Sequence, residues 1–370
     1  MSGRRPPGGD APVLYRPPAG DAAERSGMRA EERESFAVGG QAVIEGVMMR
    51  GRDFVACAVR TPGGEIVLKK EPFRSVLARL KLAKVPVLRG AIGLVETMLL
   101  GMRILSYSAE VAMPPKEGDA EGARPGGSLK EKLGLGLTMV LAFALGLALF
   151  FYIPLVLTDL TPGTEGSLAF NIVDGIFRLV IFLLYIWAIS LMRDMRRVFE
   201  YHGAEHKTIN CYEQRRPLTA VNIKACTRFH PRCGTSFLLL VMVVSILVFM
   251  PLGRPESVGE RLLRLAFVPL IGGLSYELIK LSAQERWFRW LKPVVMPGLW
   301  LQRLTTREPD LEQCEVALRA LAACLEPAEL AALTPVEEPD FSPPPLHYEE
   351  GETELDDDEE TRPRREVNAE

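Results

Sequence analysis

The sequence predicts an α-helical membrane protein with about four transmembrane helices, an amphipathic helix at the membrane interface and a small cytoplasmic β unit near the N-terminus. Four segments are long and apolar enough to cross a bilayer, which needs about 20 residues. Basic residues gather between the second and third of these segments and after the fourth. Residues 349–360 carry nine acids, so the rest of the 370-residue chain is basic although the net charge is −3. These patterns indicate alternating membrane and cytoplasmic segments.

The N-terminal region is predicted to lie outside the membrane. Residues 1–35 are rich in proline, glycine, arginine and glutamate, lack the apolar core of a signal peptide, and are expected to be disordered. Residues 36–82 should form the β unit, because residues 54–60 and 65–68 are short apolar runs on either side of the turn sequence Thr-Pro-Gly-Gly at 61–64.

Residues 85–112 are mostly apolar but carry regularly spaced charges. Arg89, Glu96 and Arg103 recur every seven residues, which places them close to one face of a helix. We therefore expect an amphipathic helix that is interfacial or re-entrant, rather than a further span.

The four predicted spans are residues 133–157, 170–192, 234–252 and 262–283. The second span contains Asp174 and Arg178, which are four positions apart and are predicted to neutralise each other within the helix bundle.

The loops between the spans differ in charge. The segment 193–232 carries nine lysines and arginines, whereas 159–169 carries none and 253–260 carries one. The positive-inside rule therefore predicts that the N-terminus, the 193–232 segment and the C-terminus are cytoplasmic. The six cysteines form no C-x-x-C pair, and those in this cytoplasmic segment are expected to be thiols or ligands.

The region after the last span should return to the cytoplasm. Residues 286–307 contain Trp287, Trp290 and Trp300 among basic residues, which is typical of an interfacial segment. Residues 310–325 have apolar side chains at helical spacing and predict a soluble helix, and the acidic tail at 335–370 is expected to be disordered.

The segment Glu200–His206 carries the clearest chemical pattern. His202 and His206 are four positions apart, so on a helix they lie on one face and reach one metal ion. Glu205 stands between them and completes H-x-x-E-H, a pattern of zinc hydrolases in which the two histidines bind zinc and the glutamate acts as general base. Gly203 lies between the histidines, where it would let another backbone approach closely.

Two further residues extend this pattern. His230 and Cys233 open the third span, near the same membrane surface, and three of the four histidines lie between 202 and 230. Two histidines on a buried stripe are also explained as hydrogen-bonded core residues, but their clustering favours a divalent metal ion, with zinc preferred. His202, His206 and His230 would make a catalytic site with Glu205 as base, whereas adding Cys233 would close a structural site.

Four other residues have two interpretations each. Cys211 and Cys226 are weaker ligand candidates and are better explained as small buried residues. Glu277, in the fourth span, pairs with Lys280 or contacts metal or substrate. Glu45 is a strand-edge or turn residue, or its segment docks near the metal site; the first is favoured because nothing in the spacing links it to the histidines.

Four motifs resemble the YqhQ-type family of bacterial membrane proteins: Gly39-Gly-Gln-Ala-Val-Ile-Glu-Gly-Val-Met-Met-Arg50, Pro86-Val-Leu-Arg-Gly90, Glu200-Tyr-His-Gly-Ala-Glu-His-Lys-Thr208 and Arg228-Phe-His-Pro-Arg-Cys-Gly-Thr-Ser236. The resemblance covers about residues 36–307. It implies an integral membrane protein with a suspected metal site, since members often carry the label "predicted metal-dependent enzyme", and it implies no substrate.

Two functions follow as hypotheses. The first is a membrane-embedded metal-dependent hydrolase that cleaves a peptide bond in a membrane protein or a lipid-linked ester. The alternative is a metal-stabilised assembly or scaffold protein without catalysis. A transporter is less favoured because the intramembrane charges can pair locally. The expected partners are the lipid bilayer and cytoplasmic or membrane proteins, and nothing in the chain predicts a nucleic-acid partner.

Overall fold

The computed structural model describes residues 38–75, 85–113, 129–282 and 296–333. The predictions of disorder at both termini, and those for Trp287 and Trp290, lie outside the described residues. Within them, the protein is mostly helical, with one small antiparallel sheet near the N-terminus and four helical segments long and apolar enough to cross a membrane. The predicted fold class is confirmed.

The sheet has four strands in chain order: β1 (Gly39–Val43), β2 (Gly46–Arg50), β3 (Phe54–Arg60) and β4 (Ile66–Pro72). The last two strands and the turn between them were predicted. The sequence predicted no individual strands for the first hairpin, because Gly39, Gly40 and Gly46 lower its strand propensity. Packing on both faces of the sheet stabilises this hairpin instead.

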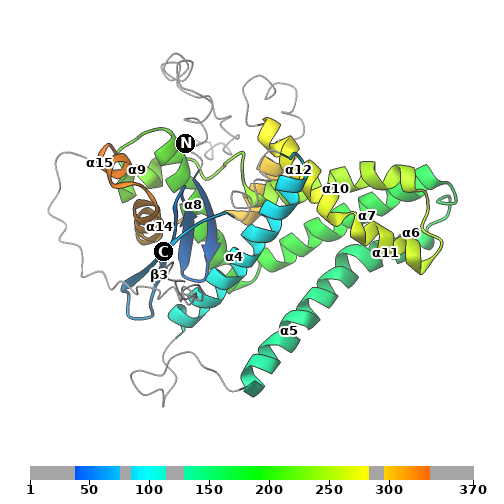
Figure 1. Ribbon diagram of the computed structural model, residues 1–370, viewed down its shortest axis with the longest axis horizontal. Coiled ribbons are helices and arrows are strands. Elements are labelled where there is room, and N and C mark those ends of the chain that lie inside the picture. Colours follow the sequence, from blue (N-terminus) through cyan, green and yellow to red (C-terminus); the bar gives the residue numbers. More distant parts are fainter. Residues whose placement is uncertain (1–37, 76–84, 114–128, 283–295, 334–370) are drawn as a thin grey trace, which may run out of the picture.

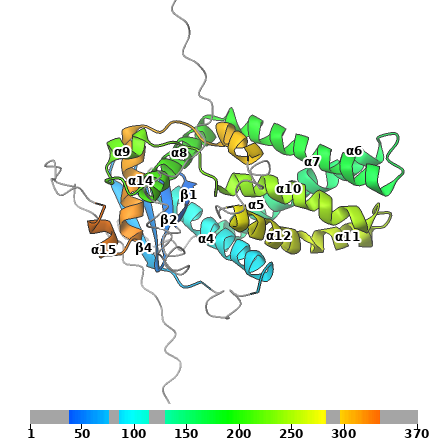
Figure 2. The same cartoon turned by 90° about the horizontal axis from the view of Figure 1, so that it is seen from above.

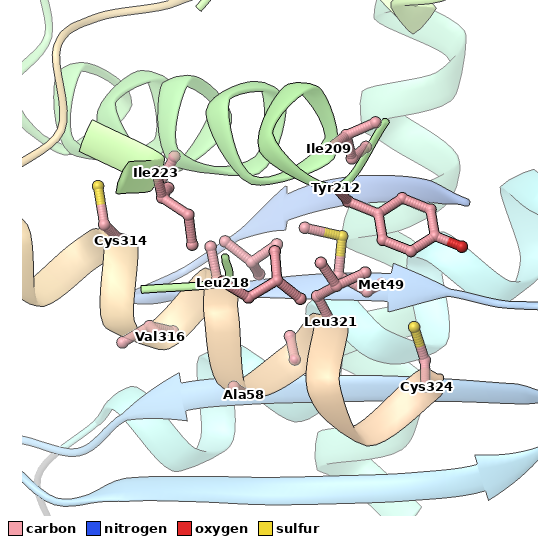
Figure 3. Close-up of a cluster of buried hydrophobic side chains, with 14 of the residues drawn as sticks. Met49, Ala58, Ile209, Tyr212, Leu218, Ile223, Cys314, Val316, Leu321 and Cys324 are labelled. Carbon is pink, nitrogen blue, oxygen red and sulfur yellow. The ribbon is translucent and has the colours of Figure 1, made fainter. Parts of the chain in front are cut away.

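One face of the sheet is covered by helices from the later chain. Helix α14 (Leu311–Cys324) is capped at its N-terminus by Asp310, whose side chain accepts a hydrogen bond from the Gln313 amide. It packs on β2 and β3, and α8 (Arg193–Glu213) packs beside it on β1 and β2. Figure 3 shows Met49 of the sheet against Leu321 of α14, and Ala58 belongs to the same buried cluster. The predicted soluble helix therefore packs on the sheet and forms part of its hydrophobic core.

The other face of the sheet is covered by α4 (Leu88–Ala112), the predicted amphipathic helix. Ile104 packs with Val43 and Met48, among other sheet residues. The first turns of α4 pack instead on the last apolar segment, where Arg89 donates to Glu277 at 2.7 Å. Helix α4 thus joins the sheet to the membrane bundle, as seen in Figure 2.

The four apolar segments are Gly136–Asp159, Ser167–Ser190, Gly234–Leu252 and Val258–Leu281. The first combines α5 (Leu129–Leu147), a π-helical turn η2 (Ala148–Tyr152) and α6 (Ile153–Asp159); the second is α7 (Ser167–Ser190); the third joins α10 (Gly234–Phe249) to η3 (Met250–Leu252); and the fourth joins α11 (Val258–Ala266) to α12 (Val268–Ser282). Pro154 is the second residue of α6 and lacks an amide hydrogen, which accounts for the π turn before it.

The helices α6, α7, α10 and α12 pack in that order, while α5 lies apart from them (Figure 1). Arg178 and Asp174 are buried and lie 2.9 Å apart, which confirms the predicted pair. At the end farthest from the sheet, Asp159 pairs with Arg254 at 2.9 Å and with Arg261 at 3.3 Å. These ion pairs tie the two charge-poor loops together.

The second span does not continue into α8 as one helix. Helix α7 ends at Ser190, and Met192 has an extended backbone before α8 begins at Arg193. Asp194 in the first turn of α8 favours a new helix start, because acidic side chains interact well with a helix N-terminus. The break lets α8 leave the bundle and lie on the sheet. Helix α9 (Ala220–Ala225), a helix over residues 296–305 and α15 (Pro327–Ala331) complete the fold.

Candidate metal centre

Polar side chains of α8 hold the loop that follows α9. Lys207 Nζ donates to the carbonyl oxygens of Lys224 at 2.9 Å and Cys226 at 2.7 Å. Asn210 Nδ2 donates to the Thr227 carbonyl at 2.7 Å. These carbonyls belong to the end of α9 and to the loop that follows it, so α8 fixes the start of the loop that leads to Cys233.

Gly203 brings a third segment to α8. A Cβ atom at this position would lie 1.9 Å from the Arg307 carbonyl oxygen, so only glycine allows this approach. Arg307 also donates its amide to the Phe199 carbonyl at 2.8 Å. The expectation that Gly203 admits another backbone is confirmed, and that backbone comes from the C-terminal side of the last span.

These contacts bring together three of the predicted ligands. One donor atom from each of His202, His206 and Cys233 lies within 4.8 Å of the others. His202 Nε2 is 3.4 Å from Cys233 Sγ, and the two imidazole centroids are 4.4 Å apart. Zinc–nitrogen and zinc–sulfur bonds of ~2.1 and ~2.3 Å place tetrahedral nitrogen and sulfur ligands about 3.5 Å apart. The donor set and its spacing therefore fit a metal ion of this class.

Both imidazoles are oriented by backbone carbonyls. His202 Nδ1 lies 2.8 Å from the Thr305 oxygen, and His206 Nδ1 lies 2.6 Å from the Arg228 oxygen. A carbonyl oxygen only accepts, so Nδ1 carries a proton in each ring, and the Nε2 of the neutral ring is free to bind a metal ion. Metal-binding histidines characteristically make such a second hydrogen bond.

The cysteine and His202 form a charged pair when no metal is bound. Burial alone would raise the pKa of Cys233, but His206 and His202 outweigh it and lower that pKa well below its usual range. Burial alone would lower the pKa of His202, but Cys233, Glu205 and the Thr305 carbonyl raise it to about 9. A buried thiolate is the form of cysteine that binds metals.

Glu205 lies between this group and the sheet. Its carboxylate is buried and lies 3.8 Å from His202 Nε2. On its other side it covers Gly40 of β1, where a Cβ atom would lie 2.7 Å from Glu205 Cγ. The N-terminal β unit therefore docks beside the histidines.

The structure corrects in part the favoured interpretation of Glu45, which was a strand-edge or turn residue whose segment lies away from the histidines. Glu45 is a turn residue with φ of 51°, as expected. It nevertheless pairs with Arg197 of α8 and accepts a hydrogen bond from Tyr201 at 3.3 Å. The sequence carried no signal for this, because 152 positions separate Glu45 from Arg197.

His230 lies next to the group but is not part of it. Its Nε2 is 3.3 Å from the Glu213 carboxylate, and its Nδ1 accepts from the Arg232 amide at 3.3 Å. Its ring centroid is 5.8 Å from that of His206. The structure thus gives both ring nitrogens of His230 other partners and brings Cys233 to the histidines instead.

The other candidates lie outside the group. Cys211 and Cys226 are buried in the core under the sheet, with Tyr212 and Ile223 nearby in the same cluster. Glu277 accepts from Arg89 of α4. That partner was missed because it lies 188 positions earlier in the chain.

The group sits at the boundary of the apolar bundle. Cys233 immediately precedes α10 and caps its first turn by accepting from the Thr235 amide. On the helix 296–305, Leu301 packs with Phe182 and Leu239 of the apolar segments. Thr305, about one helical turn further on, holds His202. The candidate centre is therefore about one turn from side chains that belong to the membrane core.

Comparison with known proteins places the chain in a family. The family model described as "Protein of unknown function (DUF1385)" matches residues 85–327, which include the candidate centre. The chain is 36% identical over 289 residues to "Uncharacterized protein YqhQ" of Bacillus subtilis (strain 168), which covers 77% of this chain and 91% of that protein. No solved structure matches the chain significantly. The chain therefore belongs to the DUF1385 family, and the predicted resemblance to the YqhQ-type family is confirmed.

Proposed function

We propose that this protein is a metal-dependent membrane hydrolase whose centre binds a divalent ion of the zinc class through His202, His206 and Cys233. The observation that carries this proposal is the meeting of three donor atoms within 4.8 Å, with both imidazoles turned toward Cys233 by carbonyl hydrogen bonds. Three protein ligands, rather than four, are typical of catalytic zinc.

The chemistry assigns a role to each residue. A zinc ion held by His202, His206 and Cys233 would supply the Lewis-acid activation of a water molecule for attack at neutral pH. Glu205, whose carboxylate lies 3.8 Å from His202 Nε2, would take the proton of the attacking water and deliver it to the leaving group. The acyl carbon gains the water oxygen, its bond to the leaving nitrogen or oxygen breaks, and the leaving atom gains the proton.

The position of the centre supports a membrane-bound substrate. It lies one turn from the apolar bundle, so the reacting bond would belong to a membrane protein or to a lipid-linked ester. The nine basic residues of 193–232 support a cytoplasmic location of this end, in the cell membrane of a bacterium.

Glu205→Gln is the variant that tests catalysis. We expect the purified zinc-loaded variant to keep its metal but to hydrolyse its substrate about 10²- to 10⁴-fold more slowly, the usual contribution of a general base. Fluorescein-labelled casein and p-nitrophenyl palmitate would serve as peptide and lipid-ester probes. Zinc content is measured on the same samples.

Glu200→Gln is the matched control, because it makes the same change on the same helix at a residue whose carboxylate accepts from Gln313. It should hydrolyse the probe like the wild type. If Glu205→Gln loses zinc together with activity, Glu205 is a ligand and not the base. If the wild-type protein hydrolyses neither probe, or the variant hydrolyses as fast, the hydrolase proposal is wrong.

A metal-stabilised assembly protein is the second candidate. The donor atoms and their carbonyl partners come from α8, the 226–233 loop and the helix at 296–305, so one ion would pin three segments together. In that case Cys233→Ser should lower the melting temperature of the detergent-solubilised protein strongly, while Glu205→Gln leaves it unchanged. Cys233→Ser with unchanged zinc content and melting temperature would exclude this role.

A further inference from the structure

The edge of β1 is open beside Glu205. Strand β1 pairs with β2 on one side and is the first strand of the sheet, so its other side faces no strand among the described residues. Its residues Gly39, Gly40, Gln41 and Ala42 are exposed or half-buried. Small side chains at three of these four positions leave the backbone accessible.

The register shows which backbone groups point outward. The Arg60 amide donates to the Glu45 carbonyl at 2.8 Å, and Gly51 donates to Phe54 at 2.9 Å, so odd-numbered residues of β2 bond toward β3. Even-numbered residues of β2 therefore bond toward β1, where Met48 lies opposite Gln41. The amides and carbonyls of Gly40 and Ala42 consequently point away from the sheet.

The next outward amide is already satisfied. Ile44, two residues beyond Ala42, donates to Ser108 Oγ of α4 at 3.3 Å. In the part of the chain that the structure describes, no hydrogen bond reaches the outward groups of Gly40 or Ala42. Ser108 thus closes one end of a short open edge that starts beside Glu205.

We propose that an extended polypeptide adds to the edge of β1 as a further strand, and that this places its peptide bond at Glu205. Gly40 and Ala42 offer two donors and two acceptors, which an extended peptide matches with its own alternating amides and carbonyls. A lipid ester has acceptors but no N–H donor, so it would leave the carbonyls of Gly40 and Ala42 unpaired. The edge therefore selects a peptide rather than a lipid-linked ester.

Cleavage of the bound peptide rests on the proposed function, whereas binding of the peptide to β1 does not. The contact between Gly40 and Glu205 is direct, since the carboxylate lies over the Gly40 backbone. A strand bound at Gly40 therefore runs past the catalytic carboxylate. The helices α8 and α4 cover the two faces of the sheet at β1. The bound peptide would therefore approach β1 along the edge between these helices.

Binding is tested with the full-length Glu205→Gln protein in detergent, which removes the complication of turnover, and fluorescein-labelled casein as an unfolded polypeptide. Ala42→Pro, added to this background, removes one outward amide, and proline is tolerated where the N–H faces solvent. We expect casein to bind about ten-fold more weakly, as loss of one hydrogen bond predicts. Ala42→Ser, which keeps the amide, should bind as the parent does.

Amide hydrogen exchange without any edge substitution gives a second test. Casein should slow the exchange of the Gly40 and Ala42 amides about ten-fold or more, while the Gln41 and Val43 amides, already bonded to β2, change little. Unchanged exchange at Gly40 and Ala42, or equal binding by Ala42→Pro, would overturn strand addition. Zinc content of the wild type is measured separately, so loss of the metal-centre proposal would not be mistaken for failure of the binding step.

Discussion

Replacing both His202 and His206 by alanine should reduce the zinc content of the purified protein from about one ion per chain to almost none. These two residues supply two of the three donor atoms, and the remaining Cys233 thiolate cannot hold the ion alone at this site. Elemental analysis of protein purified in detergent and re-equilibrated with a small excess of zinc measures this directly. Gel filtration of the same samples shows that the variant remains folded.

His230→Ala is the informative comparison. His230 has its ring nitrogens on Glu213 and the Arg232 amide, so its removal should leave the zinc content unchanged. Loss of zinc from a folded His230→Ala protein would instead support a site that includes His230, which the sequence alone left open. Absence of zinc from the wild type, even after re-equilibration, would contradict the metal centre itself.

Gly203→Ala should destabilise the protein by about 1–3 kcal/mol or more, although alanine favours helices over glycine by about 1 kcal/mol. The new methyl group would lie 1.9 Å from the Arg307 carbonyl oxygen, and a backbone atom cannot move aside as a flexible side chain does. Moving the 305–307 segment would also break the bond between Thr305 and His202. We therefore expect a lower melting temperature together with weaker zinc binding.

Gly146→Ala makes the same change in α5, where nothing lies within 4 Å of the added carbon. This variant should melt at or above the wild-type temperature. Equal melting temperatures for Gly203→Ala and the wild type would show that the C-terminal segment does not press on α8 as described.

The membrane segments could be read from the sequence because the signal is local. A bilayer requires about 20 consecutive apolar residues, and each of the four segments satisfies that requirement by itself. The spacing of His202 and His206 is local in the same sense, since one turn of α8 sets it. The break at Met192 had no comparable signal, because an extended residue between two helices leaves no pattern in hydrophobic spacing.

The rest of the candidate site depends on contacts between distant parts of the chain. Cys233 joins His202 because Lys207 and Asn210 fix the intervening loop, and Thr305 orients His202 because Gly203 admits the last segment. The sequence left open whether the three histidines form the group alone or together with Cys233, since His230 and Cys233 both stand at the start of the third span.

The sequence by itself determined that the chain is a membrane protein and which family it belongs to. It also singled out His202, His206 and Glu205 as candidate site residues. Only the tertiary structure decided that Cys233 joins the two histidines and that β1 docks on Glu205. It also decided that helices cover both faces of the sheet. Local periodicity and short-range spacing encode the first set. The second depends on backbone carbonyls and glycine contacts between segments separated by tens to more than 100 positions, which no local pattern records.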